Sequence, residues 1–488
     1  MTNLSPWFQK IRFSLPLAGM LAVAGWQLMA PVNRAVGQAV PAGELPPGET
    51  SPTDQLLPGQ SLGSNLTLNQ EVNAINAENQ SFQRFGLGLS ASGGEETNFL
   101  GAQTNQVSAG YGQFTADAAV LLHNERTRYF LLYQPQYNLY PKFSQVNNFS
   151  QMAFQNLTHA MSDRAGLEWD TTAARYLSLN QFLPQSLGIG GIGVVVPTLG
   201  VQLLQDSFEV TNLATTLTFK YLINSRTTFA GSATGSFFMM IPFPVTTTST
   251  STAPSPQELA ERFIASGGDA LLSYQLTLRD AVGAEITPVY IYGLNGAGDE
   301  AAETVQATYA RELSPTFTAS VGVGPLFIQS SSFQLGSVKV GSLQTTSYAI
   351  NASLSRQMKQ SQFAVNYSRA ILVNLLEPPI VANSVNSNAY LGLGNNWIFT
   401  GAGSYTHDGG AGALFGPGQF YGGSAQIAYQ VAKSIQFFAL YSVFSESFSL
   451  GTNQPSFGFT RNQFGGGIQF NLGNPIARSN NSTLGGIQ

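Results

Sequence analysis

The residues best suited to act on a solute are charged side chains on the polar faces of alternating segments. In the segment 126–140, Arg128 shares one face with glutamine and asparagine, while tyrosine and leucine fill the other. Successive side chains of a β-strand point to opposite faces, so a period of two residues predicts strands with one polar face. The charged residues that we predict on such faces, and therefore along a pore, are Arg84, Asp117, Arg128, Arg164, Glu168, Asp170, Lys220 and Arg279.

These charges allow two interpretations. A mixed, slightly basic wall would create a field across a pore and favour anionic or neutral polar solutes. Alternatively, opposite charges pair across the interior and only hold the shape of the protein. The residues themselves favour neither interpretation.

Catalytic side chains are scarce. The chain has three histidines and no cysteine, which removes thiolate nucleophiles and thiolate metal ligands. His123 and His159 lie beside predicted tight turns, whereas His407 lies between Ser404 and Asp408 without a nucleophile-elbow motif. We therefore predict that the chain is not an enzyme and that it has no cofactor and no metal site.

The connections between the predicted strands alternate between tight polar turns and long loops rich in glycine, serine or proline. Strand alternation alone also fits a soluble β-sandwich, but a sandwich has no reason to place short turns at one end and long loops at the other. The pattern predicts an all-β, antiparallel up-and-down transmembrane β-barrel over residues 82–472, with about eighteen strands and sixteen as the alternative. The predicted tight turns are 123–126, 162–163, 224–226, 280–283, 312–315, 358–360, 395–396 and 432–434.

Composition agrees with a barrel that crosses a membrane. Charged residues make up 10% of the 488 residues, and no stretch after residue 40 is apolar for the length of a spanning helix. A chain that crosses a membrane without such helices must cross as a closed set of strands, because every backbone polar group needs a partner. The net charge of -5 argues against nucleic acid as a partner.

The two ends of the chain differ in composition from the barrel. Residues 1–39 combine Lys10 and Arg12 with an apolar run and small residues before Ala39, which predicts a signal peptide. An uncleaved inner-membrane anchor is the alternative. Residues 40–81 predict a flexible periplasmic segment, and residues 473–488 a C-terminal tail.

The last predicted strand carries a recognisable local pattern. Gln463, Gly465, Ile468 and Phe470 place a polar residue, a glycine and two alternating hydrophobic residues on one segment. This resembles the closing-strand signal of bacterial outer-membrane barrels, and the resemblance implies recognition by the barrel-assembly machinery. The strand should pair with residues 84–90, since closure removes both sheet edges. As architecture, residues 82–472 resemble the porin-type barrels of Gram-negative bacteria, which implies an outer-membrane location, short periplasmic turns and outer-membrane lipid as a partner.

Three loop features could matter for function. In residues 241–267, Ser255, Pro256 and Glu258 predict the start of a short helix that ends at Gly267. The loop 177–206 is unusually apolar, which predicts burial in the lumen or in a contact between subunits of a homo-oligomer. The acidic pairs Glu95–Glu96 and Asp299–Glu300 are interpreted as solvated loop charge, with divalent-ion binding as the alternative.

The sequence therefore predicts an outer-membrane channel for passive diffusion of small polar solutes, narrowed by its loops. The alternative is a structural or assembly barrel for export or anchoring of surface polysaccharide, with its lumen plugged by loops. A soluble adhesive or lectin-like β-protein is a third class, which detergent-free solubility would indicate.

Overall fold

The computed structural model describes most of the chain from Phe85 to Gly473. Residues 1–84 and 474–488 lie outside the described residues, so the signal peptide, the flexible segment, Arg84 and most of the tail stay predictions. Within the barrel the undescribed residues are 98–106, 124–125, 145–146, 163, 178–185, 190–191, 196–206, 244–260, 294–298, 332, 336–337, 341, 359–360, 373–379, 394–395, 409–417, 433 and 450–455.

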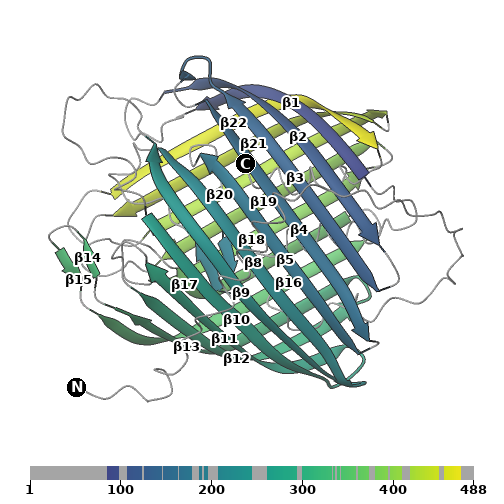
Figure 1. Ribbon diagram of the computed structural model, residues 1–488, viewed down its shortest axis with the longest axis vertical. Coiled ribbons are helices and arrows are strands. Elements are labelled where there is room, and N and C mark those ends of the chain that lie inside the picture. Colours follow the sequence, from purple (N-terminus) through teal and green to yellow (C-terminus); the bar gives the residue numbers. More distant parts are fainter. Residues whose placement is uncertain are drawn as a thin grey trace, which may run out of the picture. The chain divides into compact units, whose positions relative to one another are not determined.

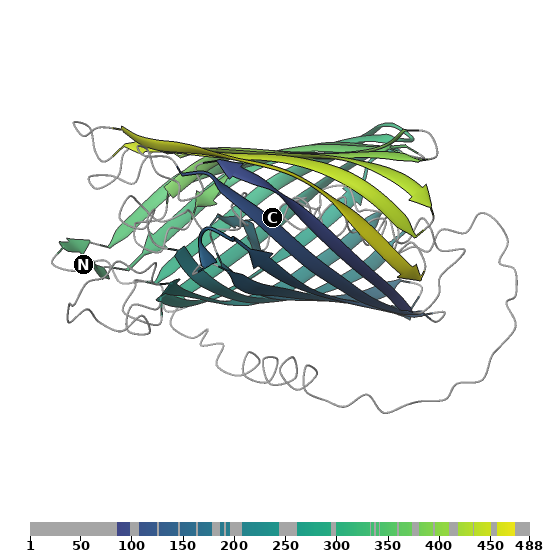
Figure 2. The ribbon, with the colours of Figure 1, turned by 90° about the horizontal axis from the view of Figure 1, so that it is seen from above.

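Eighteen strands form one closed antiparallel sheet (Figures 1 and 2). Each pairs with the next strand of the ring, and β22 pairs with β1, with Phe470 opposite Leu89. The predicted up-and-down barrel of eighteen strands is confirmed. The ring consists of β1 (Phe85–Thr97), β2 (Ala109–His123), β3 (Thr127–Leu139), β4 (Asn148–Ser162), β5 (Ala165–Leu177), β8 (Ser207–Asn224), β9 (Thr227–Phe243), β10 (Glu261–Gln275), β11 (Asp280–Gly293), β12 (Glu300–Ser314), β13 (Phe317–Ser330), β16 (Leu343–Met358), β17 (Ser361–Leu372), β18 (Ile380–Leu393), β19 (Trp397–Asp408), β20 (Gly418–Ala432), β21 (Ile435–Ser449) and β22 (Ser456–Gly473).

Two short hairpins lie in long connections outside the ring of pairings. One joins β6 (Ser186–Ile189) to β7 (Ile192–Val195), and the other joins β14 (Phe333–Leu335) to β15 (Val338–Val340). These two long connections and the others all alternate with short turns along the chain, so β1 begins and β22 ends on the short-turn side of the barrel.

Burial alternates along the strands as the period of two predicts. On β11, Val289 is 4% exposed and faces the lumen, whereas its neighbour Tyr290 is 45% exposed and faces outward. Residues that are paired across two neighbouring strands lie on the same side of the sheet. The pairing therefore assigns inward and outward positions from one strand to the next around the ring. Val289 is opposite Ala302 of β12, and both are buried.

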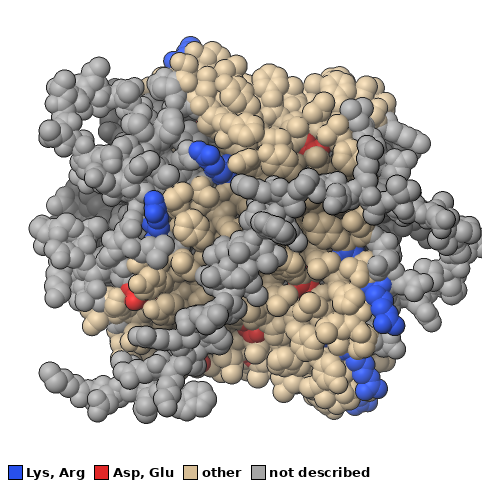
Figure 3. Space-filling view, viewed as in Figure 1, with Lys and Arg blue, Asp and Glu red and all other residues tan. Residues whose placement is uncertain are grey.

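The outer surface is apolar and aromatic. Rings near the short turns point outward, among them Tyr221, Phe363, Trp397, Tyr429 and Phe470. Figure 3 shows few charged side chains among the described residues of the face it presents. Such a belt suits hydrocarbon, with amphipathic rings at its border. The described residues include no helix of the length and apolarity needed to span a membrane.

One tight turn lies elsewhere than the sequence predicts. The turn expected at 280–283 is formed by residues 276–279, between Gln275 and Asp280. Thr277 Oγ1 donates to Asp280 Oδ2 over 2.6 Å, and the Leu276 amide donates to the Asp280 carbonyl over 2.8 Å. The prediction was wrong because Leu276 and Leu278 continue the apolar alternation into the turn, where Leu278 is 89% exposed.

The helix predicted to end at Gly267 is also wrong over its second half. Residues from Glu261 onward belong to β10, which pairs with β9 on one side and β11 on the other. Two ladders of backbone hydrogen bonds outweigh the local helix signal, because helix propensity is a weak preference that tertiary pairing overrides. Ser255, Pro256 and Glu258 lie outside the described residues.

Candidate functional site

The lumen-facing wall of the barrel carries most of the charge within the strands. We call the lumen-facing side chains of the eighteen strands the inward wall. Its described members include eight carboxylates and only three cations. The carboxylates are Glu96, Asp117, Glu168, Asp170, Asp269, Glu285, Glu300 and Glu312, and the cations are Arg128, Lys220 and Arg461.

The structure places the predicted pore-lining residues in three locations. Those on the inward wall are Asp117, Arg128, Glu168, Asp170 and Lys220. Arg164 and Arg279 lie in exposed short turns at the strand ends. Arg84 is outside the described residues. The slightly basic wall expected from the sequence is therefore wrong for the described residues, where acidic side chains outnumber basic ones.

Several charged residues of the inward wall were not predicted from the sequence, because their segments were assigned to a helix or a turn and not to a strand. Asp269 follows the expected helix, and Glu285 follows the misplaced turn. Arg461 lies two residues before Gln463 and shares its face. Its period-two spacing from Gln463 was the available signal for this inward position.

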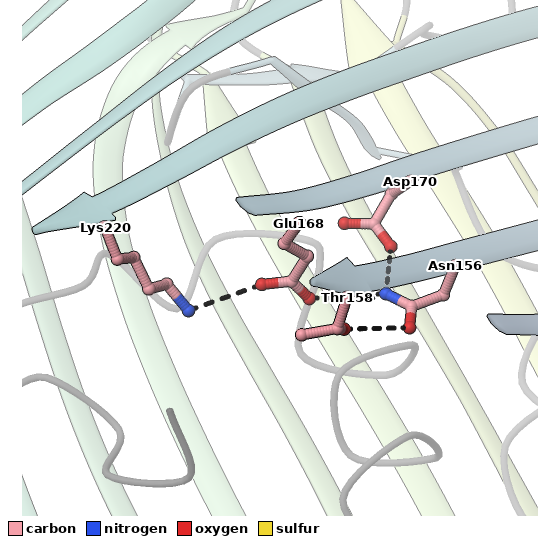
Figure 4. Close-up of polar contacts among 5 residues, drawn as sticks. All are labelled: Asn156, Thr158, Glu168, Asp170 and Lys220. Atoms are coloured by element: carbon pink, nitrogen blue, oxygen red, sulfur yellow. Dashed lines mark hydrogen bonds and ion pairs between the residues drawn. The ribbon is translucent and has the colours of Figure 1, made fainter. Parts of the chain in front are cut away.

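Glu168 and Asp170 of β5 form a charged group with Lys220 of β8, beside the polar residues Asn156 and Thr158 of β4 (Figure 4). Lys220 Nζ lies 3.3 Å from Glu168 Oε2, and Asn156 Nδ2 donates to Asp170 Oδ1 over 2.7 Å. The same amide is 3.3 Å from Glu168 Oε1, and Thr158 Oγ1 donates to Asn156 Oδ1 over 3.4 Å. Asn156 thus bridges two carboxylates, and Lys220 lies within ion-pair distance of one of them, Glu168.

The acidic character continues onto β10 and β11. Ser232 Oγ of β9 donates to Asp269 Oδ1, and Glu285 lies on the inward face opposite Leu271. The Glu285 side chain is buried, as is Gln306 opposite it on β12. From β5 to β11 the wall therefore presents carboxylates that hydroxyl and amide groups hold in place.

A second polar group lies at the seam where β22 meets β1. Arg461 is paired with Glu96, whose side chain is 0% exposed, and Tyr140 Oη donates to Glu96 Oε2 over 3.3 Å. Glu96 is on the inward wall near the end of β1, so its assignment to a solvated loop was wrong. Tyr111 lies beside Tyr140, with 6.5 Å between the ring centroids.

The predicted closing-strand residues lie on β22 and are split between its faces. Gln463 and Gly465 point inward, opposite Glu96 and Gly94 of β1, whereas Ile468 and Phe470 point outward. Gln463 Oε1 accepts a hydrogen bond from Ser442 Oγ over 3.3 Å. A Cβ atom on Gly465 would collide with the Tyr111 hydroxyl, so this glycine lets the ring lie against the seam. The role of these residues in assembly stays a prediction.

Part of the inward wall is apolar. On β10 to β13 it includes Leu271, Val289, Ile291, Leu326 and Ile328, which are almost fully buried although they face the lumen. A water-filled lumen normally has a polar lining. This apolar strip therefore needs a covering group.

The β6–β7 hairpin belongs to the apolar loop 177–206 and reaches across the barrel. The backbone of β6 lies beside β10, and that of β7 lies beside β17. From β8 the ring runs through β9, β10, β11, β12, β13 and β16 to β17. The hairpin must cross the opening of the barrel to reach a strand so far around the ring.

Two of the residues considered for catalysis, Ser404 and His407, lie on opposite faces of β19 and so do not form a catalytic pair. Ser404 is on the inward face of β19, opposite Asn386, whereas His407 is on the outward face, opposite Asn383. His407 Nδ1 lies 3.2 Å from the Gly418 carbonyl. Among the described residues there is also no cluster of three or more potential metal ligands.

Comparisons with known proteins find similar structures but no similar sequence. No protein-family model matches the chain, and no curated protein matches it. The FrpB iron transporter from Neisseria meningitidis (F3-3 variant) is 8% identical, with a TM-score of 0.40 over 80% of this chain and 82% of the other. The ferric-catecholate import receptor Fiu of E. coli K12 is 12% identical, with a TM-score of 0.38 over 80% and 82%. OccK2 (OpdF) of Pseudomonas aeruginosa is 13% identical, with a TM-score of 0.38 over 80% and 98%.

The geometry itself defines the class of protein. A closed ring of eighteen antiparallel strands with an apolar outer belt and a charged inner wall is the architecture of a transmembrane β-barrel.

Proposed function

We propose that this chain is an outer-membrane channel through which small polar solutes diffuse passively. One observation carries the proposal: the closed ring is apolar outside, whereas the described residues of its inward wall include eight carboxylates, three cations and many hydroxyl and amide groups. Charged side chains are unfavourable in contact with lipid, whereas on the inner wall of a barrel they allow water and polar solutes to enter the lumen. There is no chemical step in this function.

The wall charge supports a preference for cationic solutes. Among the described residues, Glu96 lies within ion-pair distance of Arg461 and Glu168 within ion-pair distance of Lys220. Others, such as Asp269 and Asp170, are held by neutral hydrogen-bond donors instead. A lumen with an excess of one charge concentrates counter-ions of the opposite sign.

Planar-bilayer recording tests the channel. Purified, folded protein should give stepwise currents, and a salt gradient should give a reversal potential of the sign for cation preference. Heat-denatured protein at the same concentration is the control. Folded, inserted protein without stepwise current would contradict passive diffusion, whereas current with anion preference would contradict only the selectivity.

A specific observation also favours a second function, a structural or assembly barrel with a closed lumen. The apolar strip on β10 to β13 and the hairpin beside β10 and β17 support a lumen that is filled rather than open. Removal of the hairpin separates the two functions. A narrowed channel should conduct before and after removal, whereas a closed barrel should conduct only afterwards.

The proposed partners follow from the location. Outer-membrane lipid would contact the outward belt, and the barrel-assembly machinery would recognise β22 through Gln463, Gly465, Ile468 and Phe470. Export would use residues 1–39. Accumulation of unfolded protein after replacement of Phe470 by a polar residue, with normal export, would support the assembly role.

A further inference from the structure

The outward surface of β16 to β19 carries a polar group near the long-loop ends of the strands. We call it the Arg369 cluster and define it as Tyr348, Tyr367, Arg369, Asn383 and His407. Arg369 of β17 is opposite Asn383 of β18, which is opposite His407 of β19. These residues share the outward face with Tyr348, which is exposed, and with Tyr367. Most outward residues of these strands are apolar or aromatic, so a group of polar side chains around an arginine needs an explanation.

The guanidinium of Arg369 is held in place by its neighbours. Its Cζ lies 4.3 Å from the centroid of the Tyr348 ring, and its Nη1 donates to Asn383 Oδ1 over 3.1 Å. The Tyr367 hydroxyl donates to the same oxygen over 2.9 Å. The ring and the amide therefore fix the orientation of the planar cation, which is the requirement for recognition of an anion.

Donors on this guanidinium remain without a partner among the described residues. Its Nε is enclosed by the protein and has no hydrogen-bond acceptor, whereas its Nη2 is not enclosed and no described residue pairs with it. An unsatisfied charged donor at an apolar surface is costly, so an acceptor from outside the chain would stabilise the site. Phosphate oxygens match the fork of N–H groups that a guanidinium presents.

Position and charge identify the source of that acceptor. From Phe363 near the short turn, the next outward residues of β17 are Val365, Tyr367 and Arg369. This order runs from hydrocarbon through an amphipathic ring to a cation, as expected where a strand reaches lipid headgroups. The described outward side chains of β16 to β19 include no carboxylate that could compete for the cation.

We propose that the Arg369 cluster binds the phosphate of a lipid headgroup that carries a net negative charge, in the membrane leaflet on the long-loop side. The guanidinium donates to the phosphate while Tyr348 and Asn383 hold it in plane. His407 lies in the same row and adds a second donor-bearing ring to the site. The proposal rests on the membrane location proposed above and is independent of conduction.

Lipid-dependent stability of the full-length, folded chain tests the site. The protein is reconstituted in phosphatidylcholine vesicles with or without phosphatidylglycerol or diphosphoryl lipid A, and the thermal unfolding midpoint is read from heat-modifiable migration. The midpoint of the unaltered protein should rise with either anionic lipid. R369Q should lose most of this rise, and R369K should retain part of it, since it keeps the charge without the fork.

A matched control is available on the neighbouring strand. Arg356 of β16 is outward and exposed, but it lies at the short-turn end between Phe317 and Phe363. R356Q should keep the full rise in the midpoint. The proposal is overturned if anionic lipid does not stabilise the unaltered protein, if R369Q responds as R356Q does, or if inorganic phosphate alone produces the same rise. A protein that does not fold into any vesicle would instead contradict the membrane location.

Discussion

Glu96 and Arg461 form a buried ion pair across the seam that closes the barrel, although they are separated by 365 positions in the chain. Glu96 lies on the first strand of the ring and Arg461 on the last. The Arg461 side chain is 7% exposed and that of Glu96 is 0% exposed, so the ion pair is almost completely shielded from solvent. The pair can form only when β1 and β22 are side by side, which links it to closure.

Removal of one partner of this pair should weaken the closed barrel. Arg461→Met leaves the Glu96 carboxylate buried without its cation, which typically costs about 3–5 kcal/mol. We expect a lower midpoint of urea-induced unfolding, measured by tryptophan fluorescence in vesicles. The double variant Glu96→Gln with Arg461→Met should recover much of the loss. Glu95→Gln is the control, because Glu95 is on the outward, exposed face, and it should leave the midpoint unchanged.

Gly465 should not tolerate a side chain while Tyr111 keeps its hydroxyl. The colliding atom is the end of the Tyr111 side chain, so Gly465→Ala must displace the ring from the seam. Overpacking of this kind typically costs about 1–3 kcal/mol in unfolding free energy.

Substitutions at Tyr111 and Gly112 supply the rescue and the control for this prediction. Tyr111→Phe removes the colliding oxygen, so it should be less destabilising in the Gly465→Ala background than in the unaltered protein. Gly112→Ala is the control, since a Cβ there would have no neighbour closer than 4.0 Å. Additive effects of the two seam substitutions would show that the hydroxyl does not cause the penalty.

The barrel could be predicted from the sequence because its faces follow a local rule. Tyr133 and Tyr137 are each an odd number of positions away from Gln134. The structure places both tyrosines on the outward face and Gln134 on the inward face. Alternation of short and long connections then gave the strand number. Both signals depend only on residues that are close in the sequence, so they can be read without knowing which strands pair.

The lumen could not be predicted as well, because its charge depends on pairing and on turn positions. The turn between β10 and β11 lies at 276–279 and not at the expected 280–283, so Arg279 is in the turn and not on a strand. The helix signal before Gly267 led to a helix being predicted where β10, the strand that carries Asp269, begins. The Glu96–Arg461 pair joins the first and last strands of the ring, so no pattern of neighbouring residues in the sequence predicts it. The acidic wall emerged only when the register was known.

Neutralisation of wall carboxylates should reduce cation preference. Asp269→Asn and Glu285→Gln remove charge from the inward wall of β10 and β11 while keeping side-chain size. We expect the ratio of cation to anion permeability to fall by about two-fold or more, because the wall field depends on the net charge. Lys220→Gln should raise the ratio. The measurement is the reversal potential in a potassium chloride gradient.

The control for selectivity is a carboxylate on the other side of the sheet. Glu303 of β12 is outward, opposite Pro288 and Phe327, and Glu303→Gln should leave the reversal potential unchanged. Equal shifts for Glu303→Gln and Asp269→Asn would indicate a surface-charge effect outside the lumen. Screening by high salt should reduce the effect of every substitution.

Deletion of the β6–β7 hairpin should increase single-channel conductance. Its backbone lies beside β10 and β17, on widely separated parts of the ring, so replacement of residues 186–195 by a short glycine-serine linker removes a segment that crosses the opening. The eighteen ring strands contain none of these residues, so folding and heat-modifiable migration should persist. Deletion of the β14–β15 hairpin, residues 333–340, is the matched control, and conductance should stay unchanged. An unchanged conductance after the first deletion would mean that the hairpin does not narrow the path, because a segment that obstructs flow cannot be removed without widening it.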